Sequence, residues 1–105
     1  MSIPVALSDL ATALADYPWG YLVTVSPDHR AHSLAVPTDF RDGVLHAIGG
    51  RSTNANGAAR PAVTMVFPHP EPGKYSLIVD GDLEVLDAEV VLHPTSAILH
   101  RPALG

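Results

Sequence analysis

Residues 19–37 read WGYLVTVSPDHRAHSLAVP. The first part, from Trp19 to Ser26, is rich in aromatic and β-branched residues, which are typical of a strand. The next four residues predict a turn, because Pro27 fixes its own φ angle and Asp28 can accept a hydrogen bond from its own backbone. The chain then returns as a second strand, in which Pro37 indicates an edge position, a bulge or an exit from the sheet. This stretch therefore predicts a hairpin.

The residues before this hairpin have a different periodicity. Between Leu7 and Asp16, apolar side chains are spaced i, i+3, i+4 and i+7, as on one face of a short helix. Ser8 or Asp9 can supply the N-terminal cap or the first-turn charge, and Pro18 ends the helix. The apolar positions are Leu7, Leu10, Ala11 and Leu14.

The residues after the hairpin predict further short strands, joined mostly by tight turns. They are VLHAIG (44–49), AVTMVF (62–67), YSLIVDGDLEVL (75–86), AEVVLH (88–93) and SAILHR (96–101). Gly81 permits a bend in the longest of them, and Pro94 separates the last two. One helix followed by six or seven strands, without a second long helix for crossover connections, favours an antiparallel sheet closed into a small barrel. We expect residues 1–105 to form a single domain.

Composition limits the classes of function. The chain has 105 residues, 47% of them apolar and 16% charged, a net charge of −5, six scattered Lys and Arg and no cysteine. Nucleic-acid binding draws on clustered cations, and thiolate chemistry requires cysteine, so neither is expected. No apolar run approaches the roughly 18 residues of a membrane span, and the N-terminus lacks the pattern of a signal peptide. We therefore expect a cytoplasmic protein, and the low charge favours an oligomer.

Residues 49–61, GGRSTNANGAARP, contain an unusual number of small hydrogen-bonding groups. Backbone amides in glycine-containing loops and at helix starts bind anions, and Arg51 offers a planar cation suited to phosphate. The segment is neither a Walker loop nor a GxGxxG fingerprint. From the residues alone, two interpretations stay open: a phosphate-binding loop, or a connection between strands with a solvated arginine.

Other candidate groups are weaker. The six histidines have neither HExxH spacing nor cysteine partners, so no metal site is expected. His29 and His69 are expected in turns or loops, whereas His32, His46 and His100 either face a cofactor groove or are half-buried strand residues. No Gly-x-Ser-x-Gly nucleophile elbow is present. The alternating Asp80, Asp82 and Glu84 predict a solvated face, so no catalytic residue is predicted.

Three segments together resemble a known family. They are the hairpin turn SPDHR, the segment RSTNANGAARPAVTMV and the ending VVLHPTSAILHRPA. In this order they are similar to the pyridoxamine 5'-phosphate oxidase-like family of flavin-binding split barrels. The likeness covers nearly the whole chain after the first helix and looks closest to small actinobacterial members, which often use the deazaflavin F420 in place of FMN. In the hairpin, His29 stands where the family usually has glycine.

The resemblance implies a mostly-β fold, a six-stranded antiparallel split β-barrel with one short N-terminal helix. It also implies a homodimer with cofactor sites at the dimer interface. The flavin phosphate would lie on the loop after the third strand and the flavin ring along the second strand. Thr53 stands where family members often carry a lysine. The residues implied in cofactor binding are Arg51, Ser52, Thr53 and Asn56 for the phosphate, and Ala35, Val36 and Pro37 for the ring.

Two functions follow from this resemblance. The first is an FMN- or F420-binding oxidoreductase with an unknown substrate, in which the cofactor performs the hydride chemistry. The second is a cofactor-free barrel that acts as a non-catalytic module for binding or storing a small ligand.

Overall fold

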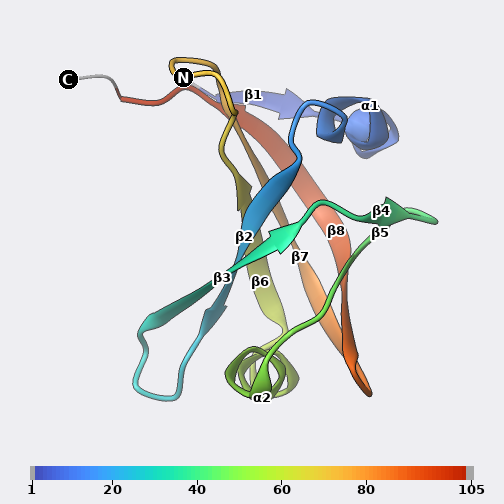
Figure 1. The fold of residues 1–105 in the computed structure, drawn as a ribbon, viewed down its shortest axis with the longest axis vertical. Coiled ribbons are helices and arrows are strands. Elements are labelled where there is room, and N and C mark those ends of the chain that lie inside the picture. The colour runs from blue at the N-terminus through green and yellow to red at the C-terminus, as the bar shows by residue number, and fades with distance from the viewer. Residues whose placement is uncertain (1, 104–105) are drawn as a thin grey trace.

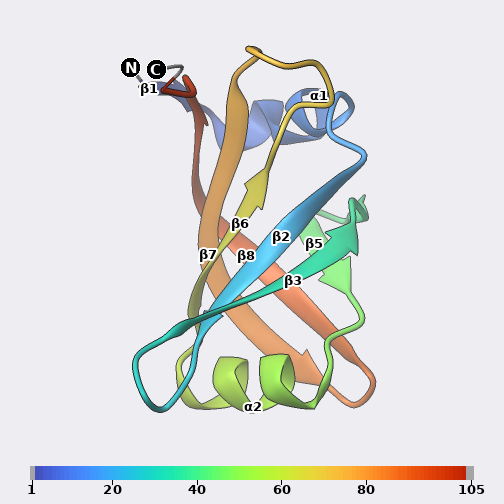
Figure 2. The same cartoon turned by 60° about the vertical axis from the view of Figure 1, so that its left-hand side comes forward.

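The computed structural model describes residues 2–103, in which eight strands form one curled antiparallel sheet (Figures 1 and 2). The order across the sheet is β3-β2-β6-β7-β8-β5-β4, and β1 pairs with β8. The predicted mostly-β split barrel is therefore confirmed, although it has more strands than the six expected. The strands are β1 (Ser2–Val5), β2 (Trp19–Val25), β3 (Ala31–Pro37), β4 (Phe40–Arg41), β5 (Val44–Ala47), β6 (Ala62–Phe67), β7 (Ser76–Leu86) and β8 (Glu89–His100).

The predicted hairpin is β2 and β3, which pair from Trp19 opposite Pro37 to Val25 opposite Ala31. β3 lies at one end of the strand order, so Pro37 occupies an edge strand. Proline lacks an amide proton, and at an edge this removes no hydrogen bond between strands. His29 in the turn adopts φ 67°, in the left-handed region. Glycine adopts the left-handed region most easily. This explains why the family that the sequence resembles usually has glycine at the position of His29.

The last two predicted strands are in fact one. β8 runs through Pro94, and the prediction of two strands separated by this proline is wrong. The register between β7 and β8 shifts between Asp80 and Gly81, and Gly81 lies opposite Pro94, so the proline is accommodated at a bulge. A Cβ atom at Gly81 would lie 2.3 Å from the carbonyl oxygen of His93. The two backbones therefore require glycine at this crossing, as the predicted bend suggested.

Helical segments lie at opposite ends of the sheet, α1 at one end and α2 at the other (Figure 2). The predicted N-terminal helix is shorter than expected and consists of a 3-10 turn at Leu7–Asp9 followed by α1 at Leu10–Leu14. A second helix, α2, spans Arg51–Ala59. The structure therefore contains the predicted N-terminal helix and, in addition, this second helix. Within the described residues, no helix is long and apolar enough to cross a membrane.

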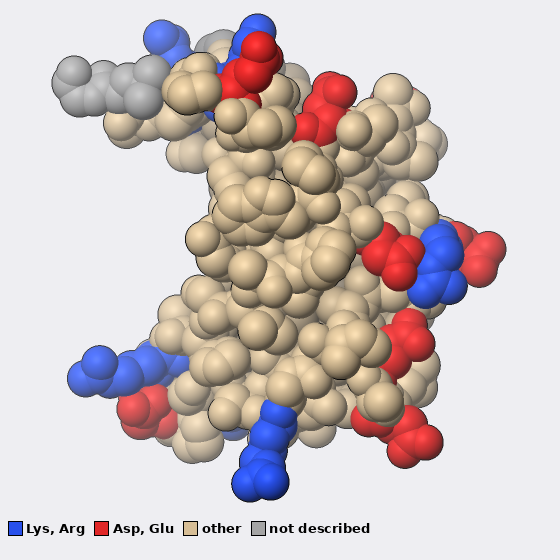
Figure 3. Space-filling model, viewed as in Figure 1, with Lys and Arg blue, Asp and Glu red and all other residues tan. Residues whose placement is uncertain are grey.

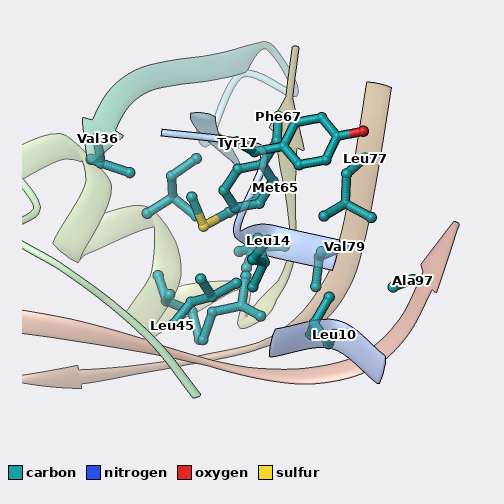
Figure 4. Packing of buried hydrophobic residues seen from close by; sticks show 14 of the residues in the cluster. Leu10, Leu14, Tyr17, Val36, Leu45, Met65, Phe67, Leu77, Val79 and Ala97 are labelled. Atoms are coloured by element: carbon teal, nitrogen blue, oxygen red, sulfur yellow. The ribbon is translucent and has the colours of Figure 1, made fainter. Parts of the chain in front are cut away.

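The core lies inside the curl of the sheet and is closed at one end by α1 (Figure 4). Phe67 is fully buried at its centre, and a Cβ atom at Gly20 would approach its ring to 2.6 Å. Phe67 thus packs directly on the β2 backbone. Full burial of a large apolar side chain contributes roughly 1.5–3 kcal/mol. Other members of the cluster include Leu10, Leu14, Tyr17, Leu22, Val36, Leu45, Met65, Leu77 and Val79.

Candidate ligand-binding site

The first turn of α2 is open toward solvent. Its N-cap residue, Gly50, is extended (φ −87°, ψ −177°), and no side chain caps the turn. The side chains of Arg51 and Ser52 are exposed, and a Cβ atom at Gly50 would meet nothing within 4 Å. Amide groups in the first turn of a helix have no partner within the helix, and the helix dipole favours an anion there. The turn therefore offers the donors that a phosphate group needs.

The inner face of α2 is polar. Thr53 is fully buried, and its Oγ1 atom has no hydrogen-bond partner among the described residues. Asn56 is also buried and donates from Nδ2 to Thr24 Oγ1 at 3.1 Å and to Ser26 Oγ at 3.4 Å. Arg60 then donates to Asn56 Oδ1 at 3.3 Å and to the carbonyl oxygen of Val25 at 2.7 Å. These contacts hold α2 on β2.

The four residues implied in phosphate binding therefore lie on two sides of one helix. Arg51 and Ser52 reach solvent, whereas the side chains of Thr53 and Asn56 point into the protein. The three residues implied in ring binding also lie on two sides, here the two faces of β3, because successive side chains of a strand face opposite sides. Ala35 and Pro37 are exposed on the outer face of β3, and Val36 belongs to the core.

A cleft of about 210 Å³ includes Pro37 of β3 and no residue of α2. It is bounded by the end of β3, by β4 and β5, and by the start of β8. It includes Pro37 at one side and Ile48 at the other, and Ile48 precedes the first residue of α2 by three positions. The side chain of Ile48 is 71% exposed and is therefore free to contact a ligand. The residues that line the cleft are Pro37, Asp39, Arg41, His46, Ala47, Ile48 and Glu89.

Two pairs of polar side chains lie in this cleft. Arg41 donates from Nε to Asp39 Oδ1 at 2.8 Å and from Nη2 to Asp39 Oδ2 at 3.1 Å. These bonds hold the pKa of Asp39 below its ordinary value, and the bond to Asp39 raises the pKa of Arg41. Both groups are therefore charged at neutral pH, and their charges cancel within the pair. In the second pair, His46 Nδ1 is hydrogen-bonded to Glu89 Oε1.

Sequence reasoning found only part of this lining. His46 was one of three histidines that the sequence left open as groove residues. His32 is half-buried on β3, its Nδ1 has no hydrogen-bond partner in the part of the chain that the structure describes, and His100 is exposed. Asp39, Arg41 and Glu89 were not predicted. Asp39 and Arg41 lie at the short strand β4, only two residues apart in the chain. Glu89 enters the cleft only because β5 pairs with β8, and it is 43 positions from His46.

Comparison with known proteins gives two matches by sequence and several by structure. No family model matches the chain. A protein of Mycobacterium bovis and one of Mycobacterium tuberculosis, both described as uncharacterized, are each 41% identical to it. Each match covers 94% of this chain and 82% of the relative. The chain belongs to the same family as these two proteins.

Solved structures with a similar fold are found for this chain. A protein described as a putative pyridoxamine 5'-phosphate oxidase from Listeria innocua matches with a TM-score of 0.70 and 15% identity, over 89% of this chain and 96% of that one. A protein described as an F420 reductase matches with a TM-score of 0.66 and 24% identity, over 81% of this chain and 93% of that one. A FAD-binding protein from Mesorhizobium loti matches with a TM-score of 0.69 and 14% identity, over 94% of this chain and 96% of that one. The resemblance to the pyridoxamine 5'-phosphate oxidase-like family is confirmed in the fold.

Proposed function

We propose that this split-barrel protein binds FMN or the deazaflavin F420 and acts as an oxidoreductase. The observation that carries the proposal is the uncapped first turn of α2, with Arg51 and Ser52 exposed beside it. A cleft begins three residues earlier in the chain and reaches Pro37. The descriptions of structures with this fold, an F420 reductase and a FAD-binding protein, support the same class of ligand.

In this proposal each part of the site has one task. Arg51, Ser52 and the free amides of the first turn of α2 bind the phosphate. Thr53 contributes its backbone amide, and Asn56 holds α2 in place through its hydrogen bond to β2. The ring lies against the outer side of Ala35 and Pro37, and Val36 contributes its backbone. The cofactor supplies hydride transfer, and the chain binds and orients it.

We also propose that two copies of the chain form a homodimer through the outer face of the sheet. Tyr21, Val66, Ile78 and Ile98 are direct partners across four neighbouring strands, so their side chains form one apolar row. The ring of Trp19 packs edge-to-face on Tyr21 at 5.0 Å, and both residues are about 40% exposed. Figure 3 shows few charged residues over the middle of the face that carries β2 and β3. An apolar row with few charged residues around it favours a contact between proteins.

The phosphate site is tested by Arg51→Ala, with Arg30→Ala as the matched control. Both arginines are exposed, but Arg30 lies in the β2–β3 turn beside Asp28. A charge-assisted hydrogen bond contributes about 1.5–3 kcal/mol, so Arg51→Ala should weaken FMN or F420 binding roughly ten- to a hundredfold. Arg30→Ala should not change it. Titration by flavin fluorescence measures the affinities, and equal affinities for the two variants would contradict the proposed site.

The second candidate function is the cofactor-free ligand-binding module. The observation that favours it is the burial of Thr53, because this position would present a lysine to the phosphate in many family members but here offers no side chain to the surface. The visible absorbance of oxidised flavin or deazaflavin in the purified protein distinguishes the two functions. A colourless protein that binds neither FMN nor F420 when they are added supports the module and excludes the oxidoreductase.

A further inference from the structure

The two asparagines of the chain both lie in α2, and one of them precedes a glycine. They are Asn54 and Asn56, and the chain contains no glutamine. An asparagine followed by glycine is especially prone to deamidation, because glycine has no side chain to shield its backbone nitrogen. Any loss of ammonia from a side-chain amide of this protein must therefore come from α2, and the Asn56–Gly57 pair has the more reactive sequence.

Deamidation at this position joins two groups of the same chain. The backbone nitrogen of Gly57 attacks the side-chain carbonyl carbon of Asn56. A C–N bond forms, the attacking nitrogen loses its proton, and the side-chain nitrogen leaves as ammonia, which gives a five-membered succinimide ring. Water then opens the ring at either carbonyl group, and the product is aspartate or isoaspartate. The reaction consumes only water and requires no ligand to enter the protein.

The folded helix keeps these two groups from reacting. Ring closure requires a ψ angle at Asn56 outside the helical range, and Gly57 lies past the first turn of α2, where backbone amides donate to the helix itself. The Asn56 side chain is fixed by its bonds to Thr24 Oγ1 at 3.1 Å and from Arg60 at 3.3 Å. Gly57 packs so closely on Leu83 that a Cβ atom would lie 2.4 Å from Leu83 Cδ2. Neither group can turn toward the other while α2 is intact.

The same features allow α2 to open separately from the sheet. Its buried residues are Thr53, Asn56 and Gly57, so no large apolar side chain anchors it. Asparagine and glycine are also weak helix formers. Among the described residues, the hydrophobic cluster inside the sheet includes none from α2, so opening the helix leaves that cluster in place. Segments with few buried apolar contacts open at a lower free energy than the whole protein.

We propose that Asn56–Gly57 is a deamidation site that the folded α2 keeps closed and that local opening of α2 makes reactive. The isoaspartate product carries an additional carbon atom in the backbone, so the helical hydrogen bonds cannot form again across it. A transient opening thus becomes a permanent change in the helix that carries Arg51 and Ser52. The inference does not depend on which ligand the protein binds.

The test compares deamidation of the folded wild type with that of Thr24→Val and Tyr17→Phe. Thr24→Val removes a hydrogen-bond partner of Asn56 without changing the shape of the side chain. Tyr17 follows α1, at the end of the sheet opposite α2 (Figure 2), and Tyr17→Phe also removes one hydrogen bond, to the carbonyl oxygen of Tyr75. Mass spectrometry of the intact chain at mildly alkaline pH measures the rate, and peptide mapping locates the product. Thr24→Val should accelerate the reaction roughly ten- to a hundredfold, and Tyr17→Phe should leave it unchanged.

The wild type unfolded in guanidinium chloride is the reference for an unprotected site. It should deamidate at Asn56 at least about a hundredfold faster than the folded protein. Equal rates in the two states, or a product at Asn54 instead, overturn the inference. Equal acceleration by Thr24→Val and Tyr17→Phe also overturns it, because the reaction would then follow unfolding of the whole protein. If Thr24→Val does not fold, Arg60→Ala, which removes the donor to Asn56 Oδ1, takes its place with the same expected result.

Discussion

Asn56 donates a 3.1 Å hydrogen bond to Thr24 Oγ1 and thereby joins α2 to β2. Both side chains are almost completely buried. The remaining inner residue of this turn, Gly57, packs so closely on Leu83 that a Cβ atom would lie 2.4 Å from Leu83 Cδ2. The buried face of α2 therefore contains Thr53, Asn56 and Gly57 and no large apolar side chain. Polar contacts and close backbone approach, rather than a hydrophobic face, hold this helix.

Asn56→Ala should lower the free energy of unfolding by about 2–3 kcal/mol, because it leaves Thr24 and Arg60 with unpaired buried groups. Urea denaturation measures this difference. Ser52→Ala is the control on the exposed side of the same helix and should stay within about 0.5 kcal/mol of the wild type. A double variant, Thr24→Val with Asn56→Leu, should be less destabilised than the sum of its single changes, because both polar partners are removed together. Strict additivity would contradict the coupling.

Lysine should have opposite effects at two adjacent positions of α2. The family resemblance suggests that a lysine at Thr53 tightens phosphate binding, but Thr53 is fully buried and contacts Gly49. Thr53→Lys should instead lower the melting temperature strongly, since a buried ammonium group loses its hydration. Ser52→Lys places the same cation in solvent next to Arg51, and it should tighten FMN binding with little change in melting. Titration and thermal unfolding of both variants test this, and a stable Thr53→Lys protein would contradict it.

Gly81→Ala should destabilise the protein, whereas Gly50→Ala should be tolerated. A Cβ atom at Gly81 would overlap the carbonyl oxygen of His93 at 2.3 Å and Leu92 Cδ2 at 2.6 Å. Since the first contact is with backbone, β7 and β8 must separate to relieve it, at a cost of about 1–3 kcal/mol or more. Gly50 has open space and an ordinary φ of −87°. Equal urea midpoints for the two variants would show that the bulge adapts freely.

Tyr17→Phe should change how stability depends on pH. The Tyr17 hydroxyl donates to the carbonyl oxygen of Tyr75 at 2.7 Å. Burial, and secondarily the charge of Asp16, raise the pKa of Tyr17 above its ordinary value of 10.0. The folded protein thus retains a proton that the unfolded chain releases, so this contribution is complete below pH 10 and is lost as the pH rises beyond it.

At neutral pH, Tyr17→Phe should therefore be less stable than the wild type by about 1 kcal/mol, through the lost hydrogen bond. The difference should shrink in the alkaline range. Urea titrations at neutral and strongly alkaline pH measure it. A difference that stays constant, or grows, above pH 10 would show that the hydroxyl does not titrate as its surroundings indicate.

Tyr21→Asp should break the proposed homodimer. Tyr21 lies at one end of the apolar row, opposite Val66, and a carboxylate there would have to lose its water in the proposed interface. Light scattering of the wild type should give about twice the chain mass of 11.1 kDa, and that of the variant the mass of one chain. Glu71→Ala, at an exposed position in the connection between β6 and β7, is the control. A wild-type monomer at micromolar concentration would rule out the dimer.

The structural features that were predicted best from the sequence are those that residues close together in the chain determine. The β2–β3 hairpin follows from strand-forming residues around a proline-containing turn, and all seven pairs of its register lie within 19 residues of one another in the chain. The length of α2 could not be predicted in this way. Asparagine and glycine are weak helix formers, and the nine-residue helix depends on contacts of Asn56 and Gly57 with residues of β2 and β7.

The candidate site was predicted only where it lies close to one sequence motif. Arg51 and Ser52 were identified from the phosphate-binding pattern, and the structure places both at an open helix start. The burial of Thr53 and Asn56 follows from the rotation of α2 about its axis, which packing determines. Glu89 was missed because its contact with His46 depends on the register between β5 and β8. Nothing in the local sequence of either strand specifies that register.

The pairing of β8 also determines the order in which this protein can fold. β8 pairs with β7 along its whole length, with β5 through residues 90–92 and with β1 through residues 97–100. The pair Ser2–His100 spans 98 positions, and such non-local pairing slows folding. β8 follows all three partners in the chain, so their edges remain unpaired during synthesis until β8 leaves the ribosome. Unpaired strand edges promote association between chains. The nascent chain is therefore vulnerable to aggregation until β8 emerges.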